Sequence, residues 1–502
     1  MQIAVASSSA LAAEAGARLA AEGGNAVDAA LASAIVAATT EPGVSSLVGG
    51  GFVTIWPPDD EPVTVDGYAE MPGREAPPES RGGGLRKADF PYGDGVSTLV
   101  GHGSVATPGS PAAIAEAHRL YGRAPWPELF RPAIEHALRG FPMPPASYRY
   151  LITSYDAIYG EAEQSVLGPD GDPAAPGTEI SIPDLAEALE AFATEGVGLL
   201  YRGEMANRLV EDMKDHGGLI GESDLEAYEA IVRQPLRADI DSWNVATNPP
   251  PAVGGATLAA MLLLASPLSW PEWGSDEIAQ MVQIQATVLD HRRRKLDVST
   301  DLSRDAATLL EKASGGDPEA LAAPSTSHTS AVDRDGLVCS VTVSMGYGAG
   351  VVIPGTGLWL NNHLGELELN RRGVHALEPG SRLASNMAPT AARRSDGSAL
   401  AVGSPGAGRI ATALLQVMVN LIKMGMGPKG AISAPRLHVD QDEHGPLVLH
   451  EPGLEIELPG MRARSFADLD MFFGGVALAT KSSSGDLSAA SDSRREGSVA
   501  YF

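Results

Sequence analysis

The first part of the chain alternates alanine-rich stretches with clusters of glycine. The Ala/Leu pattern of residues 9–22 predicts a helix, and Gly23-Gly24 supplies a left-handed residue that ends it. Asn25 is placed to cap a second helix over residues 26–39, with Asp28 close to the positive N-terminus of that helix. This order of elements is typical of closely packed layers.

The rest of the chain combines helices and strands. Residues 52–56 follow a glycine triplet and predict a short apolar strand, whereas residues 57–100 are rich in Pro, Gly and charge and are expected to be irregular. Two helices are expected between residues 111 and 140, and helices with short strands over residues 184–260. Residues 301–325 have the pattern of a helix followed by a polar loop. The pattern favours a mixed α/β enzyme.

Residues 327–333 and 337–345 alternate in the manner of two strands, joined by the hairpin sequence Asp333-Arg334-Asp335-Gly336. The second strand has one apolar face and one mostly hydroxylated face, which predicts a half-buried strand. A two-residue loop at positions 334 and 335 would place Thr326 opposite Val343, and a loop shifted by one residue would place it opposite Met345. Either register brings Ser344 within about one position of Thr326.

Composition and charge narrow the class of protein. The 502 residues are 44% hydrophobic, which is enough to build a large core. At ~100–200 residues per domain the length allows two to four domains or one large enzyme fold. With 36 Lys and Arg against 63 Asp and Glu, the formal net charge is −27. Such a field repels phosphate backbones and anionic lipid, so we expect neither a nucleic acid nor a membrane as partner.

The sequence offers no familiar metal or targeting motif. Cys339 is the only cysteine, which excludes an intrachain disulfide. The eleven histidines include no His-Glu-x-x-His motif and no close pair with metal-ligand spacing, so we expect neither metal nor cofactor. The N-terminus lacks the features of a signal peptide, and no run of ~18 uncharged apolar residues occurs. The expected location is cytoplasmic.

Several short blocks stand out along nearly the whole chain. They are Gly23-Gly24-Asn25-Ala26-Val27-Asp28, Ala106-Thr107-Pro108-Gly109, Thr326-Ser327-His328, Pro354-Gly355-Thr356-Gly357, Gly403-Ser404-Pro405-Gly406 and Phe473-Gly474-Gly475. Through these blocks, in this order, the sequence resembles the γ-glutamyltranspeptidase (γ-glutamyltransferase) family of the N-terminal-nucleophile hydrolase superfamily. The resemblance implies a four-layer αββα fold.

The resemblance also implies an inactive precursor that cleaves itself at the Ser325–Thr326 bond. The products would be a large segment 1–325 and a small segment 326–502, which together form one αββα domain. Thr326 would be the nucleophile and its own freed α-amine the base. The reference pKa of an α-amine, roughly 7.7–8.0, suits a general base near neutral pH. The hydroxyl would attack a γ-glutamyl or related amide, and water or an amine acceptor would take the acyl group, as in glutathione metabolism.

The resemblance assigns further catalytic roles by position. Ser344 matches a hydroxyl that bonds the nucleophile's amine, where the family usually has threonine. Gly406 and Ala407 match a Gly-Gly pair whose backbone N–H groups form the oxyanion hole, a kind of donor worth ~10²–10³ in rate. After Ser344 the sequence runs directly into Met345-Gly346-Tyr347-Gly348, about two residues shorter than the family pattern.

The positions that match the family's substrate clamp are altered. Ser385 and Asn386 match a Ser-Ser pair that holds the α-carboxylate of the substrate, and Glu366 matches the acid that pairs with its α-amine. Tyr68 stands where the family has an arginine that binds the same carboxylate, and whether Arg74, six residues away, takes its place is left open by the sequence.

His363 replaces the family's glutamine beside this site. An α-carboxylate buried without its partners costs ~1–3 kcal/mol, so the acyl donor is expected to differ from an ordinary γ-glutamyl compound.

Three hypotheses remain open at this point. The first is a self-processing transferase or hydrolase of γ-glutamyl compounds. The second keeps the threonine chemistry on another substrate, including hydrolytic cleavage of a carbon–carbon bond in secondary metabolism. The third is an uncleaved, non-catalytic relative. A homodimer stays possible, His328 is interpreted as structural, and residues 492–495 (Asp-Ser-Arg-Arg) are expected to be a solvated tail.

Overall fold

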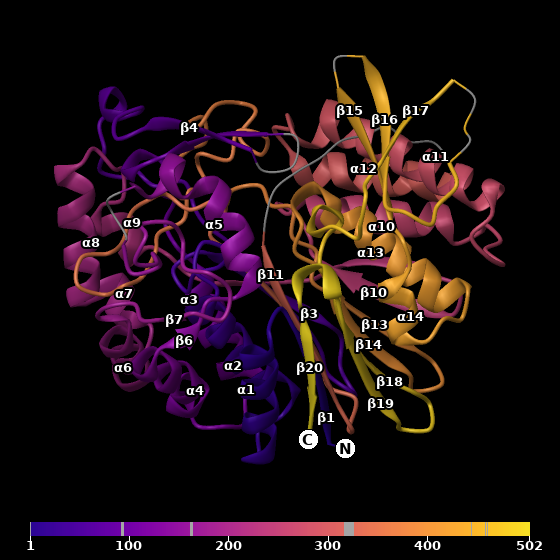
Figure 1. Ribbon diagram of the computed structural model, residues 1–502, viewed down its shortest axis with the longest axis horizontal. Coiled ribbons are helices and arrows are strands. Elements are labelled where there is room, and N and C mark those ends of the chain that lie inside the picture. The colour runs from indigo at the N-terminus through magenta and orange to yellow at the C-terminus, as the bar shows by residue number, and fades with distance from the viewer. Residues whose placement is uncertain are drawn as a thin grey trace.

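Two antiparallel sheets packed face to face form the centre of the molecule (Figure 1). The computed structural model describes residues 2–91, 95–160, 164–315, 326–442, 444–456, 458 and 460–502. Ser325 and the rest of residues 316–325 lie outside the described residues, so the loop expected there is not described.

Within the described ranges, the first sheet has seven strands, in the spatial order β20 (Ser498–Tyr501), β1 (Ile3–Ser7), β11 (Ser327–Asp333), β12 (Val338–Ser344), β2 (Gly50–Trp56), β3 (Val63–Gly67) and β8 (Ile231–Arg233). The second sheet has six described strands, in the order β19 (Leu487–Ser491), β18 (Ala477–Lys481), β14 (Ala399–Gly403), β13 (Thr390–Arg394), β10 (Trp243–Thr247) and β9 (Leu236–Ile240).

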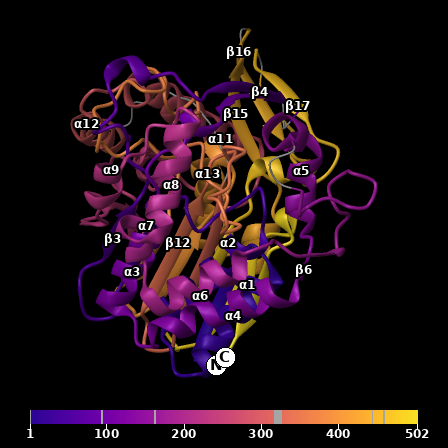
Figure 2. The same cartoon turned by 90° about the vertical axis from the view of Figure 1, so that its left-hand side faces the viewer.

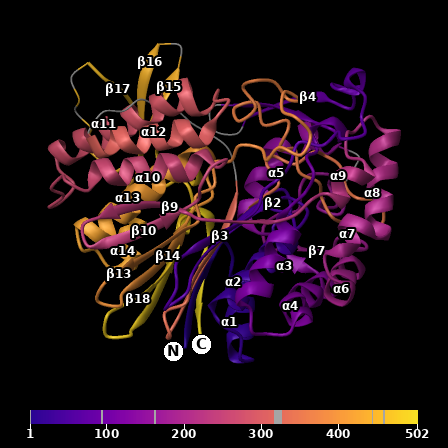
Figure 3. The ribbon, with the colours of Figure 1, turned by 180° about the vertical axis from the view of Figure 1, so that it is seen from behind.

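Helices cover the outer face of each sheet. On the first sheet and beyond it lie α1 (Ala10–Ala21), α2 (Ala26–Thr40), α3 (Ser110–Tyr121), α4 (Trp126–Arg139), α5 (Pro145–Ile158), α6 (Leu185–Glu195), α7 (Gly198–Arg202), α8 (Glu204–Asp215) and α9 (Glu222–Glu226), the side that faces the viewer in Figure 2. On the second sheet lie α10 (Val253–Ala265), α11 (Ser275–His291), α12 (Leu302–Gly315), α13 (Ile410–Met418) and α14 (Pro428–Ser433), several of them in front in Figure 3. This arrangement confirms the four-layer αββα fold.

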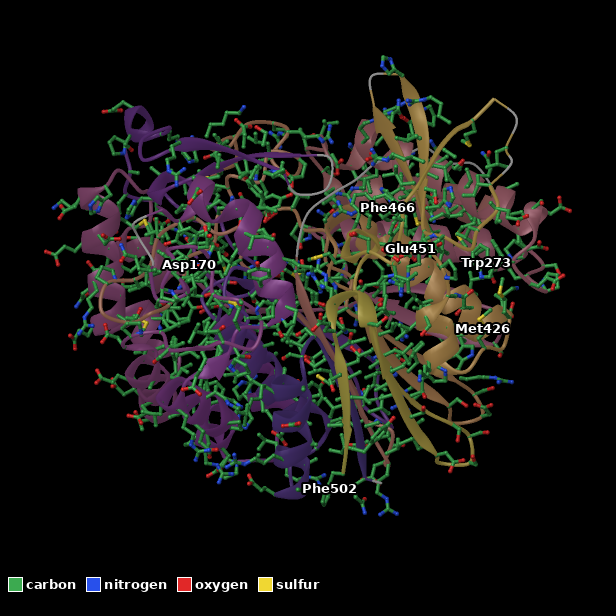
Figure 4. All side chains as sticks on the ribbon, in the orientation of Figure 1. Asp170, Trp273, Met426, Glu451, Phe466 and Phe502 are labelled. Atoms are coloured by element: carbon green, nitrogen blue, oxygen red, sulfur yellow. The ribbon has the colours of Figure 1, made fainter. Side chains whose placement is uncertain are left out.

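Three smaller described sheets lie outside the two central sheets. They are β4 (Arg86–Phe90) with β5 (Val96–Val100), β6 (Phe141–Pro142) with β7 (Glu179–Ile180), and the projecting sheet of β15 (Leu437–Asp442), β16 (Gly445–His450) and β17 (Arg462–Ser465). Glu451 and Phe466, labelled in Figure 4, lie at the base of the projecting sheet. The expectation that residues 57–100 are irregular was wrong, because β3, β4 and β5 fall within them. None of the described helices is long and apolar enough to span a membrane.

The first two helices confirm the predicted left-handed glycine after α1, where Gly23 has a φ of 99°, and the predicted Asn25 cap of α2. Ser9 caps α1, and its hydroxyl accepts a hydrogen bond from the backbone N–H of Ala12. Asn25 and Asp28 form a reciprocal capping box at the start of α2. The caps satisfy backbone donors that a helix start leaves without intrahelical partners. They fix where α2 begins, and α2 packs directly on β11 and β12.

The prediction that β12 is half-buried was wrong, since every residue of β12 is buried. Its apolar face packs toward the helices, and its hydroxylated face packs against the second sheet. There the hydroxyls of Ser330 and Ser340 donate to the carbonyl oxygens of Ala477 and Val402, at 3.0 and 3.1 Å. A hydroxylated face is therefore compatible with full burial, because each of these donors finds a carbonyl on the facing sheet.

His328 lies in the same interface between the sheets. Its Nδ1 lies 2.8 Å from the hydroxyl oxygen of Thr342 and its Nε2 lies 2.8 Å from that of Ser330. Burial lowers the pKa of His328 to about 3, so the ring is neutral at physiological pH. Both ring nitrogens have structural partners, which agrees with the interpretation of His328 as structural. Gly403 lies directly against the ring, and a Cβ at that position would come within 2.2 Å of the Cε1 atom.

The expectation of a solvated tail at residues 492–495 was wrong. Asp492, Arg494 and Arg495 are all buried. Asp492 pairs with Arg436 at 2.7 Å and with Arg494 at 3.1 Å, and Arg494 also pairs with the buried Glu451. Alternating charges satisfy one another here, which is the condition for burying them.

We predict that Gly403→Ala destabilises the protein. The added Cβ overlaps the His328 ring, and overpacking of this kind costs about 1–3 kcal/mol of unfolding free energy. Urea denaturation followed by circular dichroism measures the loss. Gly430→Ala is the matched control, because Gly430 lies in α14, where an added Cβ would meet no atom within 4 Å, and this variant should be neutral or stabilising. Equal stabilities of the two variants would contradict the prediction.

Candidate active site

Thr326 immediately precedes β11 and is buried. Ser327 pairs with Val343, so the register continues with Thr326 opposite Ser344. Both registers predicted from a two-residue loop were one position out. The loop has three residues, Arg334 to Gly336, and Gly336 adopts a φ of 92° that favours glycine. The prediction that Ser344 lies within one position of Thr326 is confirmed.

Thr326 and Ser344 share a small cavity with most of the residues predicted to bind substrate. The cavity is lined by Tyr68, Thr326, Ser344, Glu366, Leu369, Ser385, Asn386 and Met387. Its volume is about 10 Å³, close to the room that one water molecule needs. Six predicted site residues from five separate parts of the chain therefore meet in one place.

Each of these segments is positioned by its own backbone contacts. Ser344 ends β12, and its hydroxyl accepts a hydrogen bond from the N–H of Gly346 at 2.9 Å. The segment of Ser385 and Asn386 lies against the start of α10, where the N–H of Gly254 donates to the carbonyl of Ser385 at 3.1 Å. A Cβ on Gly254 would lie 1.9 Å from the Asn386 carbonyl oxygen. Glycine at position 254 is thus required for this close approach.

Tyr68 forms one wall of the cavity as a neutral phenol. Its ring stacks on Phe52 with centroids 5.3 Å apart, and its hydroxyl lies 3.2 Å from Nδ1 of His363. Burial, and to a lesser degree the charge of Glu366, raises the pKa of Tyr68 well above its ordinary value. The side chain that the resemblance matches to an arginine is therefore uncharged.

His363 does not line the cavity but supports two residues that do. Its Nε2 donates to the Ser344 carbonyl at 3.2 Å, since a carbonyl can only accept, and its Nδ1 lies 3.0 Å from a carboxylate oxygen of Glu366. Glu368 lies close by, and its carboxylate accepts a hydrogen bond from the Tyr347 hydroxyl. Burial, together with the charge of Glu366, raises the pKa of Glu368 to about 7. The surroundings of the cavity are thus acidic.

Arg74 does not replace the missing arginine. Its guanidinium pairs with Asp224 at 3.3 Å and with Glu70 at 3.5 Å, and it does not line the cavity. Arg382, which lies nearby, pairs with Glu70 and with Asp66. Among the described residues that line the cavity there is no lysine or arginine.

Gly406 and Ala407 lie at the turn between β14 and α13 and do not line the cavity. Gly406 has a φ of 124°, and a Cβ there would lie 2.7 Å from the Cα of Gly474. Ala407 has a φ of 67°, an unusual conformation for a residue with a side chain and one found where structure imposes it. Their role as an oxyanion hole stays a prediction.

Glu41 is a residue of this region that the sequence did not single out. It is buried at the end of α2, and its carboxylate accepts hydrogen bonds from Ser8 at 2.6 Å and from Ser327, the neighbour of Thr326, at 2.9 Å. Burial raises the pKa of Glu41, while the charge of Arg495 lowers it. The carboxylate thus ties together the ends of β1 and α2 and the start of β11. In the sequence, Glu41 could have been noticed as an acidic residue at the end of a helix that carries almost no other charge.

Comparisons with known proteins cover most of the chain. A family model described as gamma-glutamyltranspeptidase matches residues 12–502. The chain is 32% identical over 471 residues to a glutathione hydrolase proenzyme of Pseudomonas aeruginosa, an alignment that covers 87% of this chain and 82% of that protein. It is 29% identical over 475 residues to an acylase ACY 1 proenzyme of Pseudomonas sp. strain V22, with 89% and 84% covered.

Among solved structures, a cephalosporin acylase from Bacillus halodurans superposes with a TM-score of 0.82. The superposition covers 100% of this chain and 96% of that chain, at 24% sequence identity. At that identity the likeness establishes the fold.

We predict that Glu41 makes unfolding depend on pH. Burial raises its pKa in the folded state, so the folded protein holds this proton more tightly than the unfolded chain does. The resulting stability is fully present below the unfolded pKa of about 4.3 and is lost as pH rises through the folded pKa. Glu41→Gln mimics the protonated acid and should lose less stability than the wild type over this rise.

Urea denaturation between pH 4.5 and 7.5 measures the difference in unfolding free energy between the two proteins, in which shared titrations cancel. The exposed Glu187→Gln variant is the control and should track the wild type. A difference between Glu41→Gln and the wild type that does not change with pH would rule out this role.

Proposed function

The chain belongs to the gamma-glutamyltranspeptidase family, and from that premise we propose that it is a self-processing amide hydrolase or acyl transferase whose nucleophile is Thr326. Cleavage of the Ser325–Thr326 bond would yield segments 1–325 and 326–502 and free the α-amine of Thr326. The observation that carries the proposal is the single cavity that Thr326 shares with Ser344, Tyr68, Glu366, Ser385 and Asn386. The names of the relatives as proenzymes add support.

In the proposed reaction the α-amine of Thr326 takes the proton of the Thr326 hydroxyl, and Oγ1 attacks the carbonyl carbon of the donor amide. The proton passes to the leaving amine as the C–N bond breaks, which leaves an ester on Thr326. Water or an amine acceptor then attacks the ester carbonyl and releases the acyl group. Ser344 would hold the α-amine, and the backbone N–H groups of Gly406 and Ala407 would stabilise the oxyanion.

We predict that Thr326→Ala abolishes both cleavage and amide hydrolysis, because it removes the only hydroxyl at that position. Denaturing electrophoresis with intact-mass measurement should show two fragments for the wild type, the smaller one beginning at Thr326, and one chain for the variant. Thr326→Ser keeps a hydroxyl and should still be cleaved. A single uncleaved chain for the wild type, or cleavage of Thr326→Ala, would overturn the proposal and favour a non-catalytic relative.

The charges around the cavity bear on the acyl donor. Glu366 presents a carboxylate to the cavity, Tyr68 is a neutral phenol, and Arg74 and Arg382 are paired with other carboxylates. Among the described residues that line the cavity, a donor carboxylate would meet no lysine or arginine, whereas a donor amine would meet Glu366. We therefore propose an acyl donor that carries an amine and lacks a free carboxylate. At about 10 Å³ the cavity is smaller than such a donor, so its lining residues would have to move apart on binding.

Three anilides that differ by one group test this proposal. We predict that kcat/KM is highest for the 4-aminobutyryl p-nitroanilide, lower for the γ-glutamyl p-nitroanilide and lowest for the glutaryl p-nitroanilide. Each step should be roughly 5–150-fold, because a polar group left unpaired costs ~1–3 kcal/mol. The first two share the amine, and the last two share the carboxylate. Glu366→Gln should slow the two amine-bearing donors and spare the glutaryl donor.

A preference of the wild type for the γ-glutamyl donor would contradict the proposed substrate class while leaving the nucleophile intact. Self-cleavage without release from any of the three anilides would favour the other open hypothesis, a different amide or a carbon–carbon bond as substrate.

A further inference from the structure

A second cluster of chemically active side chains lies outside the cavity, where the end of α8 meets the 3₁₀ turn His102–Ser104. His102, Asp212 and His216 each offer one ligand-type atom, and these atoms all lie within 4.8 Å of one another. Nε2 of His102 lies 3.0 Å from Oδ2 of Asp212, and Nδ1 of His216 lies 3.1 Å from Oδ1. The two imidazole rings stack with centroids 4.5 Å apart and an interplanar angle of 17°.

We propose that His102, Asp212 and His216 bind a zinc ion. Imidazole nitrogen and carboxylate oxygen are ligands that Zn²⁺ prefers, with bonds of about 2.0–2.2 Å. In a tetrahedron with bonds of that length two ligand atoms lie about 3.3–3.5 Å apart. The separations of 3.0 and 3.1 Å to the two oxygens of Asp212 approach this value. The three ligand atoms lie within 4.8 Å of one another, so closing the site requires a movement of up to about 1.5 Å, which rotation of the mostly exposed His216 side chain can supply.

The fold brings the three ligands close together before any ion binds. Asp212 and His216 are four residues apart at the end of α8, which puts their side chains on one face of the helix. The chain just after α8 approaches the turn closely, since a Cβ on Gly218 would lie 3.2 Å from the carbonyl oxygen of His102. Little conformational entropy is therefore lost when the third ligand joins the helical pair.

The site is also reachable from solvent. The His216 side chain is 56% exposed, whereas those of His102 and Asp212 are 19% and 14% exposed. Three protein ligands leave a fourth position for water on the exposed side, which is the open type of zinc coordination.

Metal binding changes the tautomer of both imidazole rings. A carboxylate only accepts hydrogen bonds, so each of the two imidazole nitrogens that face Asp212 carries a proton in the metal-free protein. For Zn²⁺ to bind at these nitrogens, each proton moves to the other nitrogen of the same ring, so both imidazoles stay neutral and no proton is released. The Nδ1 of His216 also gives up its hydrogen bond of 2.9 Å to the Asp212 carbonyl.

A bound ion would link α8 to the His102–Ser104 turn, and this turn contacts the loop that carries Glu366. The carbonyl of Ser104, in the same turn as His102, accepts a hydrogen bond from the N–H of Leu364 at 3.1 Å. Leu364 lies two residues before Glu366. The sequence does not reveal this site because His102 and Asp212 are 110 residues apart.

Zinc binding to the full chain without a histidine tag tests the proposal. After treatment with EDTA and its removal, titration with ZnCl₂ in a calorimeter should show one Zn²⁺ per chain, and elemental analysis after gel filtration should give the same ratio. The midpoint temperature of thermal unfolding should rise when Zn²⁺ is added and return to its original value with EDTA.

His216→Ala and Asp212→Asn should each weaken binding by at least ~10–100-fold, the loss seen when mere supporting partners of a ligand are removed. His216 is mostly exposed, so its variant should fold, and circular dichroism checks this. His136→Ala, a histidine in α4, should bind as the wild type does. Absence of stoichiometric binding, or equal binding by His216→Ala, would overturn the proposal, whatever the fate of the proposed function.

Discussion

The pairing of β11 with β12, two fully buried strands at the centre of the first sheet, determines where every other part of the site must lie. The three-residue loop ending at Gly336 sets this pairing, and it places Thr326 opposite Ser344. Because side chains alternate along a strand, a slip of one residue would turn Thr326 away from the second sheet and toward α2. The position of a single glycine in a hairpin thus decides which side of the sheet carries the hydroxyl.

The sequence allowed the local features to be predicted more fully than the long-range ones. The glycine end of α1, the Asn25 cap of α2, the two strands of the hairpin and the αββα class were all predicted correctly, because short patterns and several ordered motifs determine them. The burial of β12 was not, because a hydroxylated face is buried only when a second sheet supplies carbonyl partners. Arg494 shows the same difficulty, since its partner Glu451 is 43 residues away along the chain.

The charges near the cavity illustrate what pairwise sequence matching leaves open. Six predicted site residues meet in one cavity, yet the sequence could not tell whether Arg74 would serve as a clamp. The structure pairs Arg74 with Asp224, which is far away along the chain, and with Glu70, which is close to Arg74 in sequence. Glu41 was missed for the related reason that its importance comes from Ser327, 286 residues further along.

The order of strands in the first sheet has a topological consequence. β1 lies between β20 and β11, so a strand from before residue 326 is inserted between two strands from after it. Both chain ends meet there, with the N–H of Phe502 donating to the carbonyl of Ile3 at 3.1 Å (Figure 1). Two polypeptides produced by a break at residue 326 would each contribute strands to the same sheet, with a strand of one lying between two strands of the other. They could not separate or exchange partners by rigid-body motion, and dissociation would require the sheet itself to unfold.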